Sequence, residues 1–433
     1  MKSKKIKFLE AVLRLMAKAV LWRYKPKIVG ITGSVGKTSA KESVFAVLET
    51  RFFVRKNEKN YNNEIGIPLT ILGMETGGKS LGKWVMIGLR WLGMLAWKCR
   101  YPQILILELG VDRPGDMDYL LSFVRPQIGV VTNISSSHIE FFKTLDGIAK
   151  EKGKLVESLP EDGFAILNAD DERVLNMSGR IKANVISFGF SEHADVQADR
   201  VSYNYDKNGK PEGLSFKLGH EGNNLPVRLK GVLAKHQVNA ALAGISAGIA
   251  FKINLVDSAQ GLEKLSVPLG RLNIIDGVRG SIIIDDTYNA SPVSTLAALG
   301  VLEELQASRK VAILGDMLEL GEETKDGHVA VAKKAFEIPA EIIILVGKRM
   351  KDAFEFLSDK KTENVQVFHF LDPDQAGEKA KKVVGEGDVV LVKGSQGMRM
   401  EKVVEKIMAN PEHAEKLVCR QSKEWRKKPF LEP

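Results

Sequence analysis

The chain has 433 residues and a formal net charge of +9, a length that exceeds one ordinary hydrophobic core, so we expect two or three domains. Cys99 and Cys419 are its only cysteines and lie far apart, which argues against a disulfide framework and a thiolate metal site, and favours a reducing, cytoplasmic compartment. The first 27 residues contain nine Lys and Arg residues and a single acidic residue, Glu10. The rest is therefore nearly neutral, and no nucleic-acid-binding body is expected.

Residues 1–26 are expected to form a basic amphipathic helix, with side chains such as Phe8, Leu15 and Trp22 on one broad apolar face. Arg14 and Lys18 interrupt the apolar run, so the segment resembles a secretory signal only loosely. Such a helix can lie on an anionic membrane surface or pack on the body of its own protein. Both alternatives are open.

A second unusual stretch, at about 80–100, contains three of the five tryptophans. It is too short to span a membrane. Its composition suits a membrane interface or a groove on a partner protein, and burial in the protein's own core is the alternative.

A glycine-rich loop follows the apolar run Ile28–Ile31 and precedes an expected helix at 39–50. A strand, such a loop and a helix start form a phosphate cradle, in which Lys37 supplies a charge and the Thr38 hydroxyl can reach Mg²⁺. The strict Walker pattern needs glycine where Ile31 stands, and a plain surface turn is the alternative. The loop residues expected to bind a nucleotide are Thr32, Gly33, Ser34, Val35, Gly36, Lys37, Thr38 and Ser39.

Alternating apolar runs and helical stretches predict an α/β protein. Its central P-loop-type domain with a parallel sheet covers 27–269 and is followed by a Rossmann-like domain over 270–410 and a basic, frayed tail over 411–433. Residues 195–229 alternate in polarity and contain Asn208-Gly209, which predicts a small antiparallel subregion. The expected strands are Ile28–Ile31, Ile104–Leu109, Ile128–Thr132, Ala165–Asn168, Ser281–Asp285, Lys310–Leu314, Ile342–Val346, Val365–Phe370 and Val389–Val392.

Polar clusters follow these strands, where ligands of parallel sheets bind. Glu108 ends its strand and is suited to Mg²⁺, with a buried ion pair as the alternative. His138 also lies past a strand, although a lone histidine is more often structural. Asn62 and Asn63 can hold a ligand or cap a helix. Three further clusters, Asp285–Ala290, Asp316–Gly321 and Lys393–Ser395, are expected to share one sheet edge as a site.

Taken together, these segments resemble the Mur ligases, and within them the branch that adds D-alanyl-D-alanine to a UDP-N-acetylmuramoyl tripeptide. The resemblance runs from about Lys27 to about Lys406. It rests on ordered motifs: Thr32–Thr38, Asn62–Pro68, Glu108–Gly110, Asn133–His138, Ala149–Gly153, Asn168–Asp170, His236 with Asn239, Gly270-Arg271, Asp286–Ala290, Gly315–Gly321 and Lys393–Ser395.

The resemblance implies ATP as cofactor and two Mg²⁺ sites, with Thr38, Glu108 and His138 as ligands and Lys152 as a carbamoylated lysine at the second ion. Lys37, Lys152, His138 and Glu108 would be the catalytic set. Asn239, Arg271, Asp286 and Tyr288 would contact the nucleotide. The substrates would meet Asn62, Asn63, Asp316, Glu319 and Lys393.

The implied reaction is amide-bond formation through an acyl phosphate in peptidoglycan precursor synthesis. Its substrates would be a muramyl peptide, UDP-linked or lipid-linked, and the dipeptide D-alanyl-D-alanine. Alternatives are a ligase for a folate-type, polyamide or lipid-linked acceptor, and a non-catalytic ATP-binding scaffold.

One departure from the family stands out. Only about 26 residues precede the first strand, too few for the usual UDP-binding domain. We therefore expect 1–26 and 80–100 to contact a membrane or a partner, with the enzyme cytoplasmic and peripheral at the inner face of the membrane.

Overall fold

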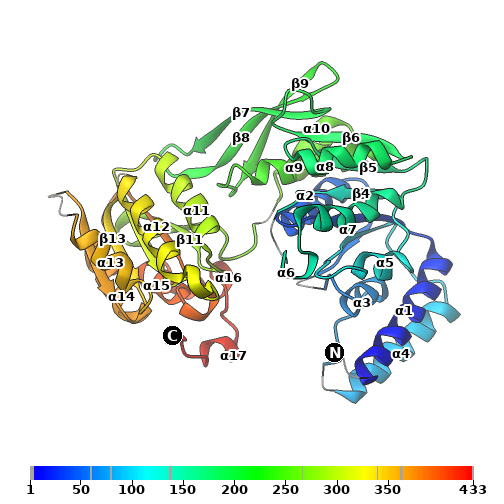
Figure 1. The fold of residues 1–433 in the computed structure, drawn as a ribbon, viewed down its shortest axis with the longest axis horizontal. Helices are drawn as coiled ribbons and strands as arrows, with labels where there is room; N and C mark the ends of the chain where they lie inside the picture. The colour runs from blue at the N-terminus through cyan, green and yellow to red at the C-terminus, as the bar shows by residue number, and fades with distance from the viewer. Residues whose placement is uncertain are drawn as a thin grey trace. The chain divides into compact units, whose positions relative to one another are not determined.

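The computed structural model describes residues 4–58, 61–78, 80–135, 139–265, 267–338, 340–360 and 364–431. They form two compact units (Figure 1). The first contains Met1–Val201, Ser215–Leu229 and Lys235–Leu265, and the second contains Ser202–Leu214, Lys230–Ala234 and Ser266–Pro433. The mixed α/β class predicted from the sequence is confirmed. None of the helices within the described ranges combines the length and apolarity needed to cross a membrane.

A nine-stranded sheet is built mainly by the first unit, in the order β2-β3-β1-β4-β5-β6-β7-β8-β9. The strand pairings from β2 to β7 are parallel, as the buried apolar runs predicted. The strands are β1 (Lys27–Thr32), β2 (Val54–Lys56), β3 (Ile104–Glu108), β4 (Ile128–Val131), β5 (Phe164–Asn168), β6 (Asn184–Gly189), β7 (Val196–Tyr205), β8 (Pro211–His220) and β9 (Asn223–Lys230). A tight turn joins β7 to β8 at Asn208-Gly209, so the predicted hairpin is present.

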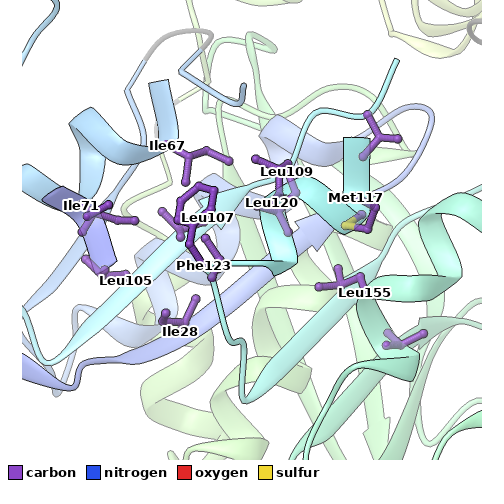
Figure 2. Close-up of a cluster of buried hydrophobic side chains, with 14 of the residues drawn as sticks. Ile28, Ile67, Ile71, Leu105, Leu107, Leu109, Met117, Leu120, Phe123 and Leu155 are labelled. Atoms are coloured by element: carbon purple, nitrogen blue, oxygen red, sulfur yellow. The ribbon is translucent and has the colours of Figure 1, made fainter. Parts of the chain in front are cut away.

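The helices of this unit cover both faces of the sheet. They are α1 (Lys4–Tyr24), α2 (Lys37–Leu48), α3 (Gly66–Leu72), α4 (Leu81–Ala96), α5 (Asp116–Leu121), α6 (Ile139–Phe142), α7 (Leu145–Glu157), α8 (Glu172–Leu175), α9 (Gln237–Ala250) and α10 (Leu255–Leu262). One core cluster joins β1 and β3 to α3, α5 and α7 (Figure 2). Alternate strand residues such as Val29 and Ile106 are buried outside this cluster, as expected for a sheet covered on both sides.

Helices α1 and α4 lie side by side at the periphery of the first unit (Figure 1). Each buries one face in the core cluster, through Leu13 and Val20 on α1 and through Ile87 and Met94 on α4. Packing on the body, one of the two alternatives from the sequence, therefore describes one face of each helix. The outward faces are considered below.

A six-stranded sheet forms the second unit, in the order β10-β11-β15-β12-β13-β14. The edge strand β10 pairs antiparallel with β11, and the pairings of β11 with β15, β15 with β12, β12 with β13 and β13 with β14 are parallel, which confirms the Rossmann-like expectation. The sequence did not predict β10. The strands are β10 (Asn273–Asp276), β11 (Ile282–Asp286), β12 (Arg309–Gly315), β13 (Ala340–Val346), β14 (Gln366–Phe370) and β15 (Asp388–Lys393).

Two hydrophobic clusters flank this sheet. One contains residues of α11, α12 and α13, and the other contains residues of α14 and α15. The helices are α11 (Pro292–Glu304), α12 (Thr324–Glu337), α13 (Lys351–Ser358), α14 (Pro373–Val383), α15 (Glu401–Ile407), α16 (Ala414–Leu417) and α17 (Lys423–Arg426).

The expectation of a frayed tail over 411–433 must be corrected, because part of this segment packs against the second unit. Val418 and Cys419 are buried in the second unit. Arg420 Nη1 lies 3.0 Å from Glu401 Oε2 and donates to the carbonyl of Thr287 at 2.9 Å. The segment is polar and basic overall, so its composition did not indicate that a few of its residues pack against the fold.

Candidate active site

The glycine-rich loop connects β1, which ends at Thr32, to α2, which begins at Lys37. Two glycines in it have left-handed backbone conformations, Gly33 with φ 147° and Gly36 with φ 81°. A Cβ atom on Gly33 would lie only 1.9 Å from Thr132 Oγ1. The loop therefore needs glycine at that position, and it delivers the chain to the N-terminus of a helix, where backbone N–H groups attract anions.

The segment after β4 braces this loop. Asn133 Oδ1 accepts a hydrogen bond from the backbone N–H of Val35 at 2.8 Å. Ser34 Oγ accepts from the N–H of Ser135 at 2.9 Å, and Thr132 Oγ1 donates to the carbonyl of Val35 at 2.6 Å. The loop is thus held by residues of the segment that follows β4.

Lys37 lies over the loop, where Nζ donates to the carbonyls of Gly33 at 2.8 Å and Ser34 at 3.0 Å. Burial lowers the pKa of Lys37, and the negative charges of Glu108 and Asp112 oppose that shift. The ammonium group therefore lies directly over the glycine-rich loop. Thr32, by contrast, uses its hydroxyl within the fold, donating to the carbonyl of Leu109 at 3.2 Å.

Glu108 ends β3 directly beside the loop, because β3 and β1 pair in parallel with Ile31 opposite Glu108. Its carboxylate is buried, and Thr38 Oγ1 donates to Oε2 at 3.0 Å. Asn62 Nδ2 donates to Oε1 at 3.3 Å. The structure thus brings together three of the predicted site residues, Thr38, Glu108 and Asn62.

Two residues near Glu108 were missed by the sequence reasoning. The buried Lys41 places Nζ 3.5 Å from Glu108 Oε2, and it donates to the carbonyl of Asn57 at 2.9 Å. Asn57 is itself fully buried, and its Oδ1 accepts from the backbone N–H of Glu108 at 2.9 Å. A lysine in a helix and an asparagine after a three-residue strand carry no sequence signal that separates them from surface residues.

The Thr38 hydroxyl and the Glu108 carboxylate offer the oxygen ligands that Mg²⁺ prefers, so these two residues fit the ion that the family implies. His138, the third expected ligand, lies outside the described residues. Across the described ranges, no group of three His, Cys, Asp or Glu side chains could hold a metal ion. The role of His138 stays a prediction.

Lys152 lies on α7 with its side chain buried. Burial, reinforced by the positive charge of Lys37, lowers the pKa of Lys152 to about 8. A sizeable fraction of the amine is therefore neutral near physiological pH, the form that can add carbon dioxide. The environment fits a carbamoylated lysine, which would supply an oxygen ligand where the unmodified side chain supplies none.

Asn63 and Asn239 have different surroundings. Asn63 Oδ1 accepts from the backbone N–H groups of Ile65 and Gly66, at 3.2 and 2.9 Å, so this side chain caps the start of α3. That is the capping alternative left open by the sequence. Asn239 Nδ2 donates to Asp170 Oδ2 at 3.1 Å, while its buried Oδ1 has no hydrogen-bond partner in the described part of the chain. Ser39 lies in the first turn of α2.

In the second unit, the three clusters expected at one sheet edge do meet. Lys393 Nζ donates to Asp286 Oδ2 at 2.7 Å and to the carbonyl of Asn289 at 2.8 Å. Ser395 Oγ accepts from the N–H of Leu318 at 2.8 Å. This hydrogen bond connects the cluster Asp316–Gly321 to the other two. Burial raises the pKa of Asp286, and the ammonium of Lys393 opposes the shift. The parallel pairing of β11 and β15, with Asp286 opposite Lys393, explains this contact.

Arg271, Tyr288, Asp316 and Glu319 complete the predicted residues of this unit. The guanidinium of Arg271 stacks over the Tyr288 ring, with Cζ 4.4 Å from the ring centroid. The buried Asp316 carboxylate accepts from the backbone N–H groups of Arg349 and Met350, so it organises the loop after β13. Glu319 is exposed. The substrate roles of Asp316 and Glu319 stay predictions.

Two family models match the chain: the Mur ligase middle domain over residues 90–248, and the Mur ligase, glutamate ligase domain over residues 270–396. A relative from Bacillus subtilis, named UDP-N-acetylmuramoyl-tripeptide–D-alanyl-D-alanine ligase, is 31% identical over 403 residues. The alignment covers 92% of this chain and 79% of the relative.

Two solved structures extend the comparison. MurF from Acinetobacter baumannii superposes with a TM-score of 0.75 and 26% identity, covering 91% of this chain and 79% of that chain. MurF ligase from Thermotoga maritima, in complex with ADP, has a TM-score of 0.71 and 26% identity. That match covers 92% of this chain and 83% of the other.

Proposed function

This chain belongs to the Mur ligase family, and we propose that it is an ATP-dependent, ADP-forming ligase of peptidoglycan precursor synthesis. It adds D-alanyl-D-alanine to the terminal carboxylate of a muramyl peptide. The observation that carries this proposal is the contact of Thr38, at the start of the helix after the phosphate loop, with the buried carboxylate of Glu108. A hydroxyl and a carboxylate at that place suit a Mg²⁺ ion on the phosphates of ATP, which the reaction requires.

Two group transfers account for the product. A carboxylate oxygen of the acceptor attacks the γ-phosphorus of ATP, the bond to the β-phosphate oxygen breaks, and ADP leaves with that electron pair. The free amine of D-alanyl-D-alanine then attacks the acyl carbon. Inorganic phosphate leaves, and the nitrogen loses a proton to give the amide. Lys37 and the N–H groups of the loop are placed to bind the phosphoryl oxygens on which charge develops.

Two Mg²⁺ ions belong to the proposal. Thr38, Glu108 and His138 would hold one, and a carbamate on Lys152 would help to hold the other. When bound, such ions neutralise phosphoryl oxygens and polarise the groups they contact. The role of this chain's residues is to orient them: Lys41 and Asn62 position the Glu108 carboxylate, and burial keeps the Lys152 amine reactive toward carbon dioxide.

The remaining site residues take roles by the same family reasoning. We propose that Asn239, Arg271, Asp286 and Tyr288 contact the nucleotide. Lys393, Asp316 and Glu319 would face the amine substrate. Asn62 would face the acceptor, beside Asn63, whose side chain caps α3. The paired Lys393 and Asp286 support a polar site at the carboxyl edge of the second sheet. The corresponding domain division is 27–269 and 270–410, with the helix 1–26 before it and the segment 411–433 after it.

We propose two candidates for the acceptor, a UDP-linked and a lipid-linked muramyl peptide. Both UDP-linked and lipid-linked muramyl peptides carry the carboxylate that the reaction requires. We place the enzyme in the cytoplasm, where ATP is available, with peripheral contact to a membrane through residues 1–26 and 80–100.

Phosphate release and product mass test the activity together. The purified chain is incubated with ATP, Mg²⁺, a muramyl tripeptide acceptor in UDP-linked or lipid-linked form, and D-alanyl-D-alanine. We expect phosphate release to require both substrates, and the product mass to equal the acceptor plus the dipeptide minus water. Lys37→Met should abolish release, whereas the exposed Lys150→Met should leave it unchanged. ATP turnover without either substrate, or none with any acceptor, would count against the ligase.

A further inference from the structure

Helices α1 and α4 form one structural element of the first unit. Trp91 Nε1 on α4 donates to the carbonyl of Met16 on α1 at 3.1 Å. Farther along both helices, the Tyr24 hydroxyl donates to the carbonyl of Met94 at 2.9 Å. Because these contacts advance together along both sequences, the two helices run in the same direction, as Figure 1 also shows. Their N-terminal ends therefore lie at the same end of the pair.

Each helix has an apolar face turned away from the core. On α1, Phe8, Leu15 and Trp22 recur every seventh residue and are 72%, 63% and 79% exposed. They lie opposite the buried Leu13 and Ala17, because residues two apart in a helix point in nearly opposite directions. A soluble helix with one buried face normally has a polar face on the other side.

Helix α4 repeats this arrangement. Leu81, Val85, Leu89 and Leu92 share its outward face and are 80%, 57%, 64% and 54% exposed. The buried Ile87 and the tryptophans that pack on the core lie on the other side. Trp97, just past the helix, is 75% exposed. The two adjacent helices thus expose more large apolar side chains than a solvated surface ordinarily carries.

On the described parts of the two helices, every exposed charged residue is basic. The sequence has no acidic residue between Glu75 and Glu108, and Glu10, the one acid of α1, is buried. Exposed basic residues on and beside the two helices include Lys4, Lys7, Lys18, Arg23, Lys25, Lys83, Arg90, Lys98 and Arg100. Apolar side chains surrounded by cations complement a surface that is apolar inside and anionic at its boundary.

We propose that the exposed faces of α1 and α4, here termed the α1–α4 surface, rest on an anionic lipid bilayer. Both helices would lie in the plane of the headgroups. Neither is long and apolar enough to span the bilayer. A second copy of the chain fits this surface less well, because two such surfaces would bring their basic residues together. The inference deepens the proposed function by placing the ligase at the membrane, but vesicle binding requires no ligase activity.

Flotation of the full chain with vesicles tests the proposal. We expect the protein to float with vesicles of phosphatidylcholine and phosphatidylglycerol, and to float less with phosphatidylcholine alone. Phe8→Ser, Trp22→Ser and Leu89→Ser combined should weaken binding by about tenfold or more, since each change removes an apolar contact with lipid. The matched control combines Val256→Ser, Val293→Ser and Leu371→Ser, which are exposed apolar residues elsewhere (52%, 80% and 60%), and it should float like the wild type.

A charge series gives a second, independent readout. Lys7→Gln, Lys18→Gln and Lys83→Gln combined should reduce binding to anionic vesicles, by roughly fivefold per neutralised residue at low salt. Lys325→Gln, Lys333→Gln and Lys351→Gln remove three exposed lysines of the second unit and should have little effect.

Three results would overturn the proposal: no flotation of the wild type with anionic vesicles, unchanged flotation of the apolar triple variant, or a wild-type dimer that the apolar variant converts to a monomer without any vesicle binding. The last would identify a second copy as the occupant. Phosphate release measured without vesicles separates the two hypotheses. A chain that ligates but does not float contradicts only the membrane proposal, and one that floats but does not ligate contradicts only the proposed activity.

Discussion

Lys41 Nζ lies 3.5 Å from Glu108 Oε2, and both side chains are almost completely buried. The same carboxylate oxygen accepts the Thr38 hydroxyl. Lys41 therefore acts as a positioning residue: it neutralises a buried carboxylate that would otherwise be expensive to keep ionised, and it holds that carboxylate beside the phosphate loop.

Lys41→Met should destabilise the protein by about 3–5 kcal/mol, because it leaves the charge of Glu108 buried without its cation. Lys402→Met provides the control. Lys402 forms a more exposed ion pair with Asp374 at 2.8 Å, and its loss should cost about 1 kcal/mol or less. Chemical denaturation measures both effects. Equal losses in the two variants would show that the Lys41–Glu108 pair is no more than a surface contact.

Gly33→Ala and Gly36→Ala should differ in their effect on ATP binding. The Cβ of Gly33→Ala would collide with Thr132 Oγ1 and reshape the loop. We therefore expect ATP affinity to fall about 100-fold or more. A Cβ at Gly36 would have no heavy atom closer than 3.9 Å, so it would add only left-handed backbone strain. For Gly36→Ala we expect ATP affinity to fall about tenfold. Calorimetric titration with a nonhydrolysable ATP analogue gives both affinities.

Adding Thr132→Ala to Gly33→Ala removes the oxygen atom responsible for the collision. We expect a partial recovery of ATP affinity in this double variant. Affinities that fall equally in the two glycine variants, with no recovery, would exclude the collision as the cause.

Lys152 should make stability depend on pH in bicarbonate-free buffer. Its pKa is about 8 in the folded protein, against 10.5 for an unperturbed lysine. Below about pH 8 both states hold the proton, and the folded state carries the cost of a buried cation. As the pH rises from about 8 to 10.5 the folded protein loses its proton first, so stability increases, by about 2–3 kcal/mol in total.

Lys152→Met should remove this rise, whereas Lys150→Met, which changes an exposed lysine of the same helix, should keep it. With ¹³C-bicarbonate added, a carbamate resonance should grow as the pH rises through about 8 and be absent from Lys152→Met. The same pH profile in both variants would contradict the assignment.

Asp285 should have the opposite pH dependence. Its side chain is fully buried, and within the described chain Oδ2 has no hydrogen-bond partner. Burial raises the pKa of Asp285 from 3.8 to about 7. The folded state therefore retains a proton that the unfolded state releases, and stability falls by about 2–4 kcal/mol as the pH rises from about 4 to 7.

Asp285→Asn should accordingly be more stable than the wild type at pH 8 and similar to it at pH 4. Calorimetric unfolding at both values measures this, with the exposed Asp359→Asn as control. A variant that is less stable than the wild type at pH 8 would show that the Asp285 carboxylate is ionised and has a stabilising partner.

Much of the fold was predictable because buried parallel strands appear in the sequence as short apolar runs, and all nine expected strands are present. Three strands were missed. The apolar run of β6 is short and is interrupted by Ser187, and the other two strands lack such a run. β2 has only three residues, and its central one is Arg55. β10 is a four-residue edge strand that ends in the exposed Asp276. Short strands at sheet edges are decided by pairing with a neighbour, which no local pattern reports.

The site was predictable in a similar, partial way. The sequence could place Glu108, Asp286 and Lys393 at the polar sheet edges because each ends a strand of a parallel sheet. Asn63 could not be distinguished from a ligand, since only the orientation of its side chain shows that it caps α3. Lys41 was not identified, because no local pattern separates a buried helical lysine from a solvated one.

The sequence alone determined the phosphate loop, the order of the two sheets and the positions of their polar ends, because these depend on local periodicity and on glycine at particular positions. Only the tertiary structure decided which polar residues meet. The contacts of Lys41 with Glu108 and of Asn133 with the loop join segments far apart in the chain. The tertiary structure also decided how the phosphate loop could be interpreted. Its missing Walker glycine left its role open in the sequence, and the structure places a buried carboxylate against the Thr38 hydroxyl that follows it, because β3 lies beside β1.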